Sequence, residues 1–198
     1  TPADDEIVLT SGKSYSNVFH ANGGSASFSV MANTLRGVYG TDVLLATANS
    51  FTGSVLQADY NKKMAASMIM PNGLMSRQRT MTGAELKETV RAFVEGCEGG
   101  FVPFNRGSLP VVSGIAVEVK EASGSYTLTG ITRNGQPLRD DDTVTVTCLA
   151  AEKQMEALLA SGSGTSAGED TWVKNTWRDH VSGGGAALAE PENYMTLR

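Results

Sequence analysis

The chain has 198 residues, 40% of them apolar and 19% charged, which is enough apolar material for one core of ordinary size. Its net charge is −5, and its Lys and Arg residues are scattered, so it offers no basic patch for a phosphate backbone. No apolar run reaches the roughly 18 residues that a membrane span needs. We therefore predict a single domain over residues 1–198, with no nucleic-acid partner and no membrane span.

The first quarter of the chain predicts a strand, a helix and a second strand. Residues 6–9 are typical of a strand and a polar connection follows, so that 1–24 form an N-terminal strand and its connection. Over residues 25–35 apolar side chains recur at helical spacings, with Ser25 as the candidate N-cap and two glycines shortly afterwards as stop signals. Residues 43–46 are a short continuous apolar run, which indicates a strand buried on both faces.

The next region contains a turn and a well-marked helix start. Residues 64–70 are apolar at nearly every position, and Pro71-Asn72-Gly73 then predicts a turn. Thr82-Gly83-Ala84-Glu85 has the pattern of a capping box, in which the Thr hydroxyl and the Glu carboxylate each accept a backbone N–H of the other residue. The apolar positions that follow share one helical stripe, namely Leu86, Val90, Phe93 and Val94.

Alternating residues after position 114 indicate a β meander. Apolar and polar side chains alternate over 115–119, as in a half-buried strand, and residues 126–132 and 143–148 are β-rich runs that would pair with it in turn. Asn134-Gly135 suits the tight turn between them. Asp140, Asp141 and Asp142 lie in the same connection and lack the alternating ligand spacing of a calcium loop, so they predict a solvated loop.

The last fifty residues predict a helix over 155–159, a flexible internal linker over 161–169 and a late helix over 172–181. The helical spacing of Trp172 and Trp177 predicts that both indoles anchor this late helix on the core. Residues 194–197 indicate a final strand at a sheet edge. Together these elements predict an α+β fold, a mixed β-sheet with helices packed on it.

The sequence carries little of the chemistry that an active site needs. His20 and His180 are the only histidines, too few for a dinuclear metal centre, and His180 is better placed to interact with the C-terminal helix dipole or to pack beside Trp177. Cys97 ends a predicted helix and Cys148 ends an apolar strand, where the helix dipole and burial respectively disfavour a thiolate. We therefore expect no catalytic residue and no cofactor in this domain, and two buried thiols.

Several short motifs, taken in order, resemble the C-terminal domain of the 5'-nucleotidase family. The similarity covers roughly residues 25–198, and the most specific match is Met81-Thr82-Gly83-Ala84-Glu85-Leu86-Lys87-Glu88, which is similar to the family's Leu-Thr-Gly-x-Glu-Leu-Lys helix start. The other matching stretches are Val30–Arg36, Thr41–Asn49, Met70–Gly73, Val112–Val117, Asn134–Leu138 and Pro191–Leu197.

This resemblance implies a division of labour. In the family an N-terminal domain holds two divalent metals and hydrolyses phosphate esters, and the C-terminal domain binds the nucleoside. For this chain it therefore implies a nucleotide or other phosphorylated small molecule as ligand, an N-terminal metallophosphatase domain as partner, and a bacterial secreted, periplasmic or cell-surface location.

The resemblance transfers only part of the family's binding site. Asn49, Gly73 and Gly100 match family positions, whereas the two Phe rings that hold the base correspond to Asn72 and Cys148. Phe51, Phe101 and Phe104 lie in nearby loops and could rebuild an aromatic wall or serve as packing residues. Our candidate substrate-binding set is Asn49, Phe51, Asn72, Gly73, Gly100 and Phe101. Arg77 and Arg79 could meet an anionic ligand or remain solvated charges.

These observations lead to three hypotheses. The first is a substrate-binding, non-catalytic domain of a 5'-nucleotidase-like metallophosphoesterase with a divergent base pocket. The second is a binding or interaction module that kept the fold and lost nucleotide recognition. The third, an independent hydrolase that uses Cys97 or Cys148, has little support because neither thiol lies in an activating environment.

Overall fold

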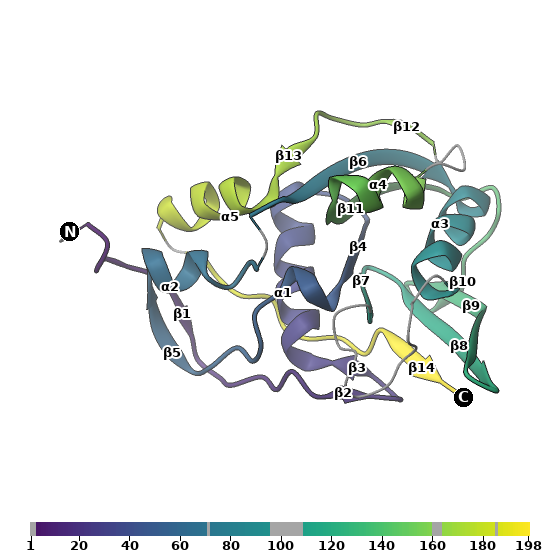
Figure 1. The fold of residues 1–198 in the computed structure, drawn as a ribbon, viewed down its shortest axis with the longest axis horizontal. Coiled ribbons are helices and arrows are strands. Elements are labelled where there is room, and N and C mark those ends of the chain that lie inside the picture. Colours follow the sequence, from purple (N-terminus) through teal and green to yellow (C-terminus); the bar gives the residue numbers. More distant parts are fainter. Residues whose placement is uncertain (1–2, 71, 96–108, 160–163, 185) are drawn as a thin grey trace.

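The computed structural model describes residues 3–70, 72–95, 109–159, 164–184 and 186–198. Within these ranges the chain forms an α+β fold in which a larger and a smaller β-sheet share helices and one hydrophobic core (Figure 1). The predicted fold class is therefore confirmed. Among the described residues, no helix is both long enough and apolar enough to cross a membrane.

The larger sheet forms the centre of the molecule, with the strand order β12-β6-β11-β4-β7, and β13 pairs with β6 as well. Strand β4 runs parallel to its neighbour β11 and antiparallel to its other neighbour β7, while β11 and β6 are antiparallel. The predicted strand over 43–46 is buried on both faces, since its four residues have no exposed surface. The bounds are β4 Val43–Thr47, β6 Leu74–Thr82, β7 Pro110–Ser113, β11 Thr143–Ala151, β12 Thr165–Ser166 and β13 Thr171–Trp172.

Strand β6 is the largest feature that the sequence pattern did not predict. It pairs with β11 along its whole length, from Leu74↔Ala151 to Thr82↔Thr143, and β12 and β13 pair with its other edge. Its central residues 77–80 are polar and only half buried, so the strand lacks the apolar alternation that marks an amphipathic strand. The backbone hydrogen bonds on both edges hold it in the sheet instead.

The smaller sheet has the order β10-β9-β8-β14 and lies at the lower right of Figure 1. The predicted pairing of 115–119 with 126–132 is confirmed by β8 and β9, and the final strand β14 lies at the edge of this sheet beside β8. The predicted three-stranded meander was wrong, because residues 143–148 belong to β11 of the larger sheet. The bounds are β8 Ala116–Ala122, β9 Ser125–Arg133, β10 Gln136–Pro137 and β14 Met195–Leu197.

Asp42 connects the two sheets through its carboxylate. Thr145 of β11 donates its backbone N–H and its hydroxyl to Oδ2 of Asp42, at 2.9 and 3.0 Å, and Arg133 of β9 lies 3.1 Å from Oδ1. Burial by itself would raise the pKa of Asp42, but the hydrogen bonds from Thr145 and the charges of Arg133 and Arg36 outweigh it and lower the pKa. The carboxylate is thus held ionised at the junction of the sheets.

Two of the predicted helices begin where the sequence indicated. Helix α1 (Ala26–Tyr39) has Ser25 as its N-cap and ends at Gly40, whose positive φ of 68° closes the helix. Helix α3 (Gly83–Glu95) begins with the predicted capping box, in which Thr82 N–H donates to Glu85 Oε2 at 2.8 Å and Glu85 N–H to Thr82 Oγ1 at 3.2 Å. Helix α4 (Glu152–Leu159) packs on β6 and β11.

The late helix α5 (Val173–Ser182) is anchored by one of its two candidate tryptophans. Trp177 is fully buried and donates its indole N–H to the Ala65 carbonyl at 2.8 Å, while the ring of His180 lies beside it at 5.9 Å between centroids. Trp172 is 45% exposed, so the prediction that both indoles anchor the helix was wrong. Trp172 is the N-cap residue, and its backbone is held by the pairing of β13 with β6.

The first 66 residues contribute several further short elements. Strand β1 (Ile7–Ser11) was expected, but its antiparallel partner β5 (Ala58–Asn61), helix α2 (Lys62–Ala66) and the short pair β2 (Phe19–His20) and β3 (Gly24–Ser25) were not. Within the predicted linker 161–169, Thr165–Ser166 form β12, and Ala167 N–H donates to the Gln78 carbonyl.

Candidate ligand-binding site

The parallel pair β4 and β11 places two chain turns at the same edge of the larger sheet. Strand β4 ends at Thr47 and strand β11 at Ala151, and the antiparallel neighbour β6 starts there, because Leu74 pairs with Ala151. In open α/β sheets the crevice outside the carboxyl ends of the strands is the usual place for a ligand. We name this place the carboxyl-edge pocket.

The carboxyl-edge pocket has a volume of about 390 Å³. Its polar lining comes from Thr47, from Asn49 and Ser50 of the short helix η1 (Ala48–Ser50), and from Gln154 of α4. Its apolar lining comes from Met70, Leu74, Ala150 and Ala151. Among the described residues that line it, none carries a charge, so this part of the pocket suits an uncharged ligand group with hydrogen-bonding edges and an apolar face.

Backbone hydrogen bonds hold the outer side of this pocket in place. Met70 N–H donates to the Ser50 carbonyl at 3.1 Å, and Thr52 N–H donates to the Met68 carbonyl at 3.1 Å. Between them Ile69 is fully buried and pairs with Phe51 through a β-bridge. The segment with Asn49 and the segment with Met70 are therefore fixed relative to one another before any ligand binds.

Ser50 is an unusual member of the lining. It is 1% exposed, and its hydroxyl oxygen has no hydrogen-bond partner within the part of the chain that the structure describes. A buried hydroxyl without a partner costs about 1–3 kcal/mol. Ser50 thus offers a donor and an acceptor beside a pocket that already holds two amide side chains.

The structure places the predicted binding residues in different surroundings. Asn49 is exposed and lines the carboxyl-edge pocket. Asn72 and Gly73 form the exposed turn before β6, but Asn72 lines a second pocket, where its Oδ1 accepts a hydrogen bond from Lys174 Nζ at 2.9 Å. Gly100 and Phe101, with Phe104, lie outside the described residues.

Phe51 is not part of the pocket wall. Its side chain is 4% exposed and packs on Phe28, with 6.2 Å between the ring centroids. Phe51 therefore belongs to the core, which agrees with the alternative that the loop Phe residues serve in packing. Its ring is not available to stack on a ligand in this conformation.

Cys148 and Arg77 also lie away from the pocket. Cys148 is fully buried within β11, and burial raises the pKa of its thiol to about 12 although Arg79 and Arg77 act to lower it. The prediction of a buried, inactive thiol is thus confirmed for Cys148, whereas Cys97 lies outside the described residues. Arg77 forms a two-point ion pair with Asp170, with its Nε 3.0 Å and its Nη2 2.7 Å from Oδ2, and so is neutralised within the fold.

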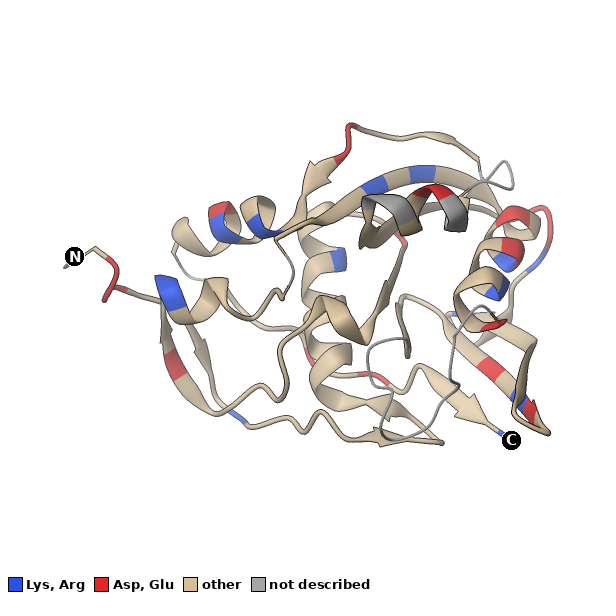
Figure 2. Ribbon diagram, in the orientation of Figure 1, with Lys and Arg blue, Asp and Glu red and all other residues tan. Residues whose placement is uncertain are grey.

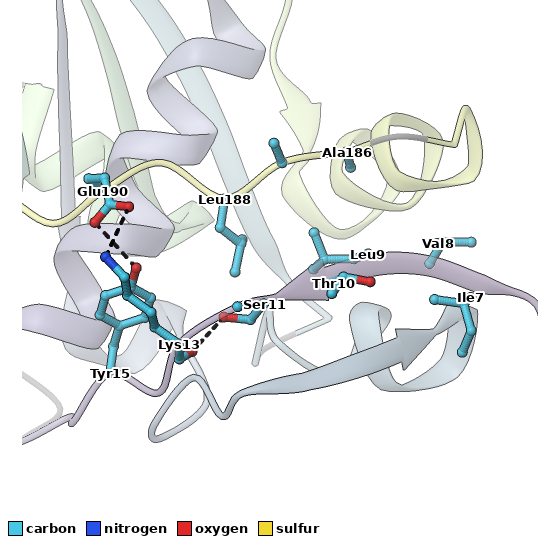
Figure 3. Close-up of a pocket in the computed structure, with 12 residues that line it drawn as sticks. Ile7, Val8, Leu9, Thr10, Ser11, Lys13, Tyr15, Ala186, Leu188 and Glu190 are labelled. Atoms are coloured by element: carbon cyan, nitrogen blue, oxygen red, sulfur yellow. Dashed lines mark hydrogen bonds and ion pairs between the residues drawn. The ribbon is translucent and has the colours of Figure 1, made fainter.

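No group of His, Cys, Asp and Glu side chains suited to a metal ion occurs among the described residues. Another cavity, of about 470 Å³, runs along β1 and residues 186–190 (Figure 3). Lys13 and Tyr15 close one end of it by contacting Glu190, and none of the predicted binding residues lies there.

Ser50, Met70 and Gln154 are lining residues that sequence reasoning did not select as candidates. Recognising these residues would have required knowing that β6 pairs with β11. This pairing brings the start of β6 and the preceding Met70 next to the end of β11. Because β6 was not predicted, its neighbours could not be placed.

The fold has counterparts among solved structures. The chain superposes on a 5'-nucleotidase precursor from Thermus thermophilus with a TM-score of 0.66 at 12% identity, over 97% of this chain and 39% of the other. It superposes on the NAD nucleotidase of Haemophilus influenzae with a TM-score of 0.66 at 17% identity, over 100% of this chain and 39% of the other. It also matches a sulfate thiohydrolase, SoxB, from Thermus thermophilus, with a TM-score of 0.68 at 12% identity, over 97% of this chain and 35% of the other.

The similarity is structural, since no protein-family model and no curated sequence matches the chain. The fold is that of the 5'-nucleotidase C-terminal domain, and the chain spans about two fifths of the length of the nucleotidase structures that it matches.

Proposed function

We propose that this chain is the substrate-binding, non-catalytic domain of a 5'-nucleotidase-like metallophosphoesterase that acts on nucleotides or related phosphate esters. The observation that carries the proposal is the position of Asn49, which lies at the carboxyl ends of β4 and β11 in a pocket whose described lining is uncharged, in a fold shared with nucleotidases. Divalent metals and phosphate ester hydrolysis are assigned to a separate N-terminal domain.

The lining of the pocket supports binding of the nucleoside part of such a ligand. The amides of Asn49 and Gln154 can each donate and accept hydrogen bonds at the edge of a heterocyclic ring. Met70 offers a polarizable thioether for the face of the ring, in place of the aromatic side chains of the family. The base pocket is in this sense divergent.

Calorimetric titration of the domain with adenosine and AMP tests the proposal. Each ligand should bind in the micromolar to millimolar range, and with similar affinity, because the lining that the structure describes has no charged residue to contact the phosphate. Asn49→Ala and Gln154→Ala should each weaken binding about fivefold, since each removes hydrogen bonds worth about 1 kcal/mol. Gln57→Ala changes an exposed glutamine outside the pocket and should have no effect.

The second candidate function is an interaction module without nucleotide recognition. The observation that favours it is the loss of the family's aromatic pair, because Asn72 and Cys148 stand at those positions and Phe51 is in the core. If neither adenosine nor AMP binds at millimolar concentration, the first proposal fails and the second stands.

A further inference from the structure

A second pocket lies on the other side of the turn at residues 72–73, between α2 and α5. It has a volume of about 380 Å³ and is lined by Ala66, Asn72, Trp172, Lys174, Asn175 and Arg178. Only Asn72 belongs to the candidate set described above. We name it the α5 pocket.

The walls of the α5 pocket are rigidly held. Trp177 is fully buried between α5 and α2, and its indole N–H donates to the Ala65 carbonyl, one residue before Ala66 of the pocket wall. On the other side, the backbone of Trp172 is fixed by its pairing with Met75 of β6. A ligand would therefore meet a surface whose backbone is already in place.

The pocket is basic in a chain whose net charge is −5. Lys174 and Arg178 are four residues apart on α5, so their side chains lie on one face of the helix. Figure 2 marks basic positions on this helix in blue. The hydrogen-bond partners of Lys174 Nζ are neutral oxygens, at 2.9 Å from Asn72 Oδ1 and 3.5 Å from the Met70 carbonyl. Within the described ranges, the carboxylate in ion-pair range of Arg178 is that of Asp179, at 4.0 Å.

Arg77 is a cation of the same fold whose charge is neutralised by an ion pair, and it serves as a comparison. Its guanidinium makes three hydrogen bonds to Asp170 and is mostly buried in that contact. Arg178 and Asp179 are instead at least 60% exposed and in marginal contact, which is weak compensation in water. The two cations of the α5 pocket thus retain most of their capacity to bind an anion.

Trp172 gives the pocket a flat apolar wall. It is 45% exposed, and it is among the few large apolar side chains of the described residues with so much exposed surface. A ring can stack on an indole while an anionic substituent reaches a neighbouring Lys or Arg. An indole beside two cations whose charges are at most weakly neutralised therefore favours ligands that combine a planar ring with an oxyanion.

We propose that the α5 pocket is a second ligand site, which binds small organic anions that carry a planar ring, such as aromatic phosphate monoesters or aromatic carboxylates. Arg178 and Lys174 contact the oxyanion, and Trp172 contacts the ring. The site is separate from the carboxyl-edge pocket, and this proposal does not depend on the function proposed for that pocket.

Titration of the domain with phenyl phosphate, followed by tryptophan fluorescence and by amide chemical shifts, tests this site. We expect saturable binding in the millimolar range or tighter, with shifts at residues 172–178. Inorganic phosphate and phenol, which each lack one half of the ligand, should bind at least fivefold more weakly, and benzoate distinguishes a carboxylate from a phosphate ligand. Binding should weaken with added salt, because it includes the attraction of exposed charges.

Single-residue variants distinguish specific binding in the α5 pocket from nonspecific electrostatic attraction of the anion to the protein. Lys174→Glu and Arg178→Glu should each weaken phenyl phosphate binding at least tenfold, and Trp172→Ala at least threefold. Lys120→Glu makes the same change of charge at an exposed position of β8 and should leave binding unchanged. An equal loss in Lys120→Glu, shifts confined to the carboxyl-edge pocket, or no saturation at millimolar ligand in low salt would each overturn the proposal. Asn49→Ala should not affect this site.

Discussion

At the scale of single residues, the glycine of the Thr-Gly-x-Glu motif has a role that local sequence does not show. A Cβ on Gly83 would lie 1.8 Å from the Arg139 carbonyl oxygen, and Gly83 N–H donates to the Asp142 carbonyl at 2.7 Å. The motif thus combines a capping box for α3 with a close approach of the loop before β11. This explains why a small residue is needed inside a pattern whose capping function involves only Thr82 and Glu85.

The buried thiol of Cys148 should make the stability of the domain depend on pH. Burial raises its thiol pKa from 9.0 to about 12, so between these values the folded chain keeps a proton that the unfolded chain loses. The stability that this protonated thiol contributes is complete below pH 9 and falls as the pH rises toward 12. Urea unfolding of the wild type and of Cys148→Ala at a series of pH values measures the effect.

The comparison of these two proteins removes the contributions of other groups that titrate in alkali. The difference in the free energy of unfolding between wild type and Cys148→Ala should be constant at neutral pH and should shrink above pH 9. A difference that stays constant up to pH 11 would show that the thiol is not buried as described.

At the scale of the elements, α5 is held by one indole and exposes the other. Trp177→Ala should destabilise the domain by about 3–5 kcal/mol, because it leaves a cavity and removes the partner of the Ala65 carbonyl. Trp172→Ala should cost less than about 1 kcal/mol, since the side chain is half exposed. Thermal unfolding followed by circular dichroism measures both, and similar losses in the two variants would contradict the assignment of Trp177 as the anchor.

Strand β6 shows how pairing can override local pattern. Its middle residues, Arg77 to Thr80, have no apolar alternation, yet all of them pair with β11 on one edge. On the other edge Arg79 and Thr80 pair with β12, and the residues just before Arg77 pair with β13. The Arg77–Asp170 ion pair, whose partner lies directly before β13, adds a contact across the second edge. A strand of this kind is specified by its neighbours, which are far away along the chain.

At the scale of the whole molecule, the described apolar residues of both sheets form one continuous core cluster. We therefore predict one cooperative unfolding transition, in which the two sheets lose structure together. Tryptophan fluorescence, which reports on α5 beside the larger sheet, and the amide NMR signals of β8 and β9 in the smaller sheet should change at the same urea concentration. Separate midpoints would indicate two folding units in place of the single domain over 1–198.

The sequence alone determined the features that depend on near neighbours along the chain. The capping box of α3, the N-cap Ser25, the strand buried on both faces and the β8–β9 pairing follow from residues a few positions apart, because caps, turns and periodicity are local. The order of the short motifs was also enough to indicate the fold of the 5'-nucleotidase C-terminal domain.

Only the tertiary structure decided the assignments that depend on distant parts of the chain. It placed β11 in the larger sheet, put Phe51 in the core, and separated Asn49 and Asn72 into two pockets. The physical reason is that the carboxyl-edge pocket is made where β4, β6 and β11 meet, and strand pairing across roughly a hundred residues leaves no trace in the pattern of any one segment.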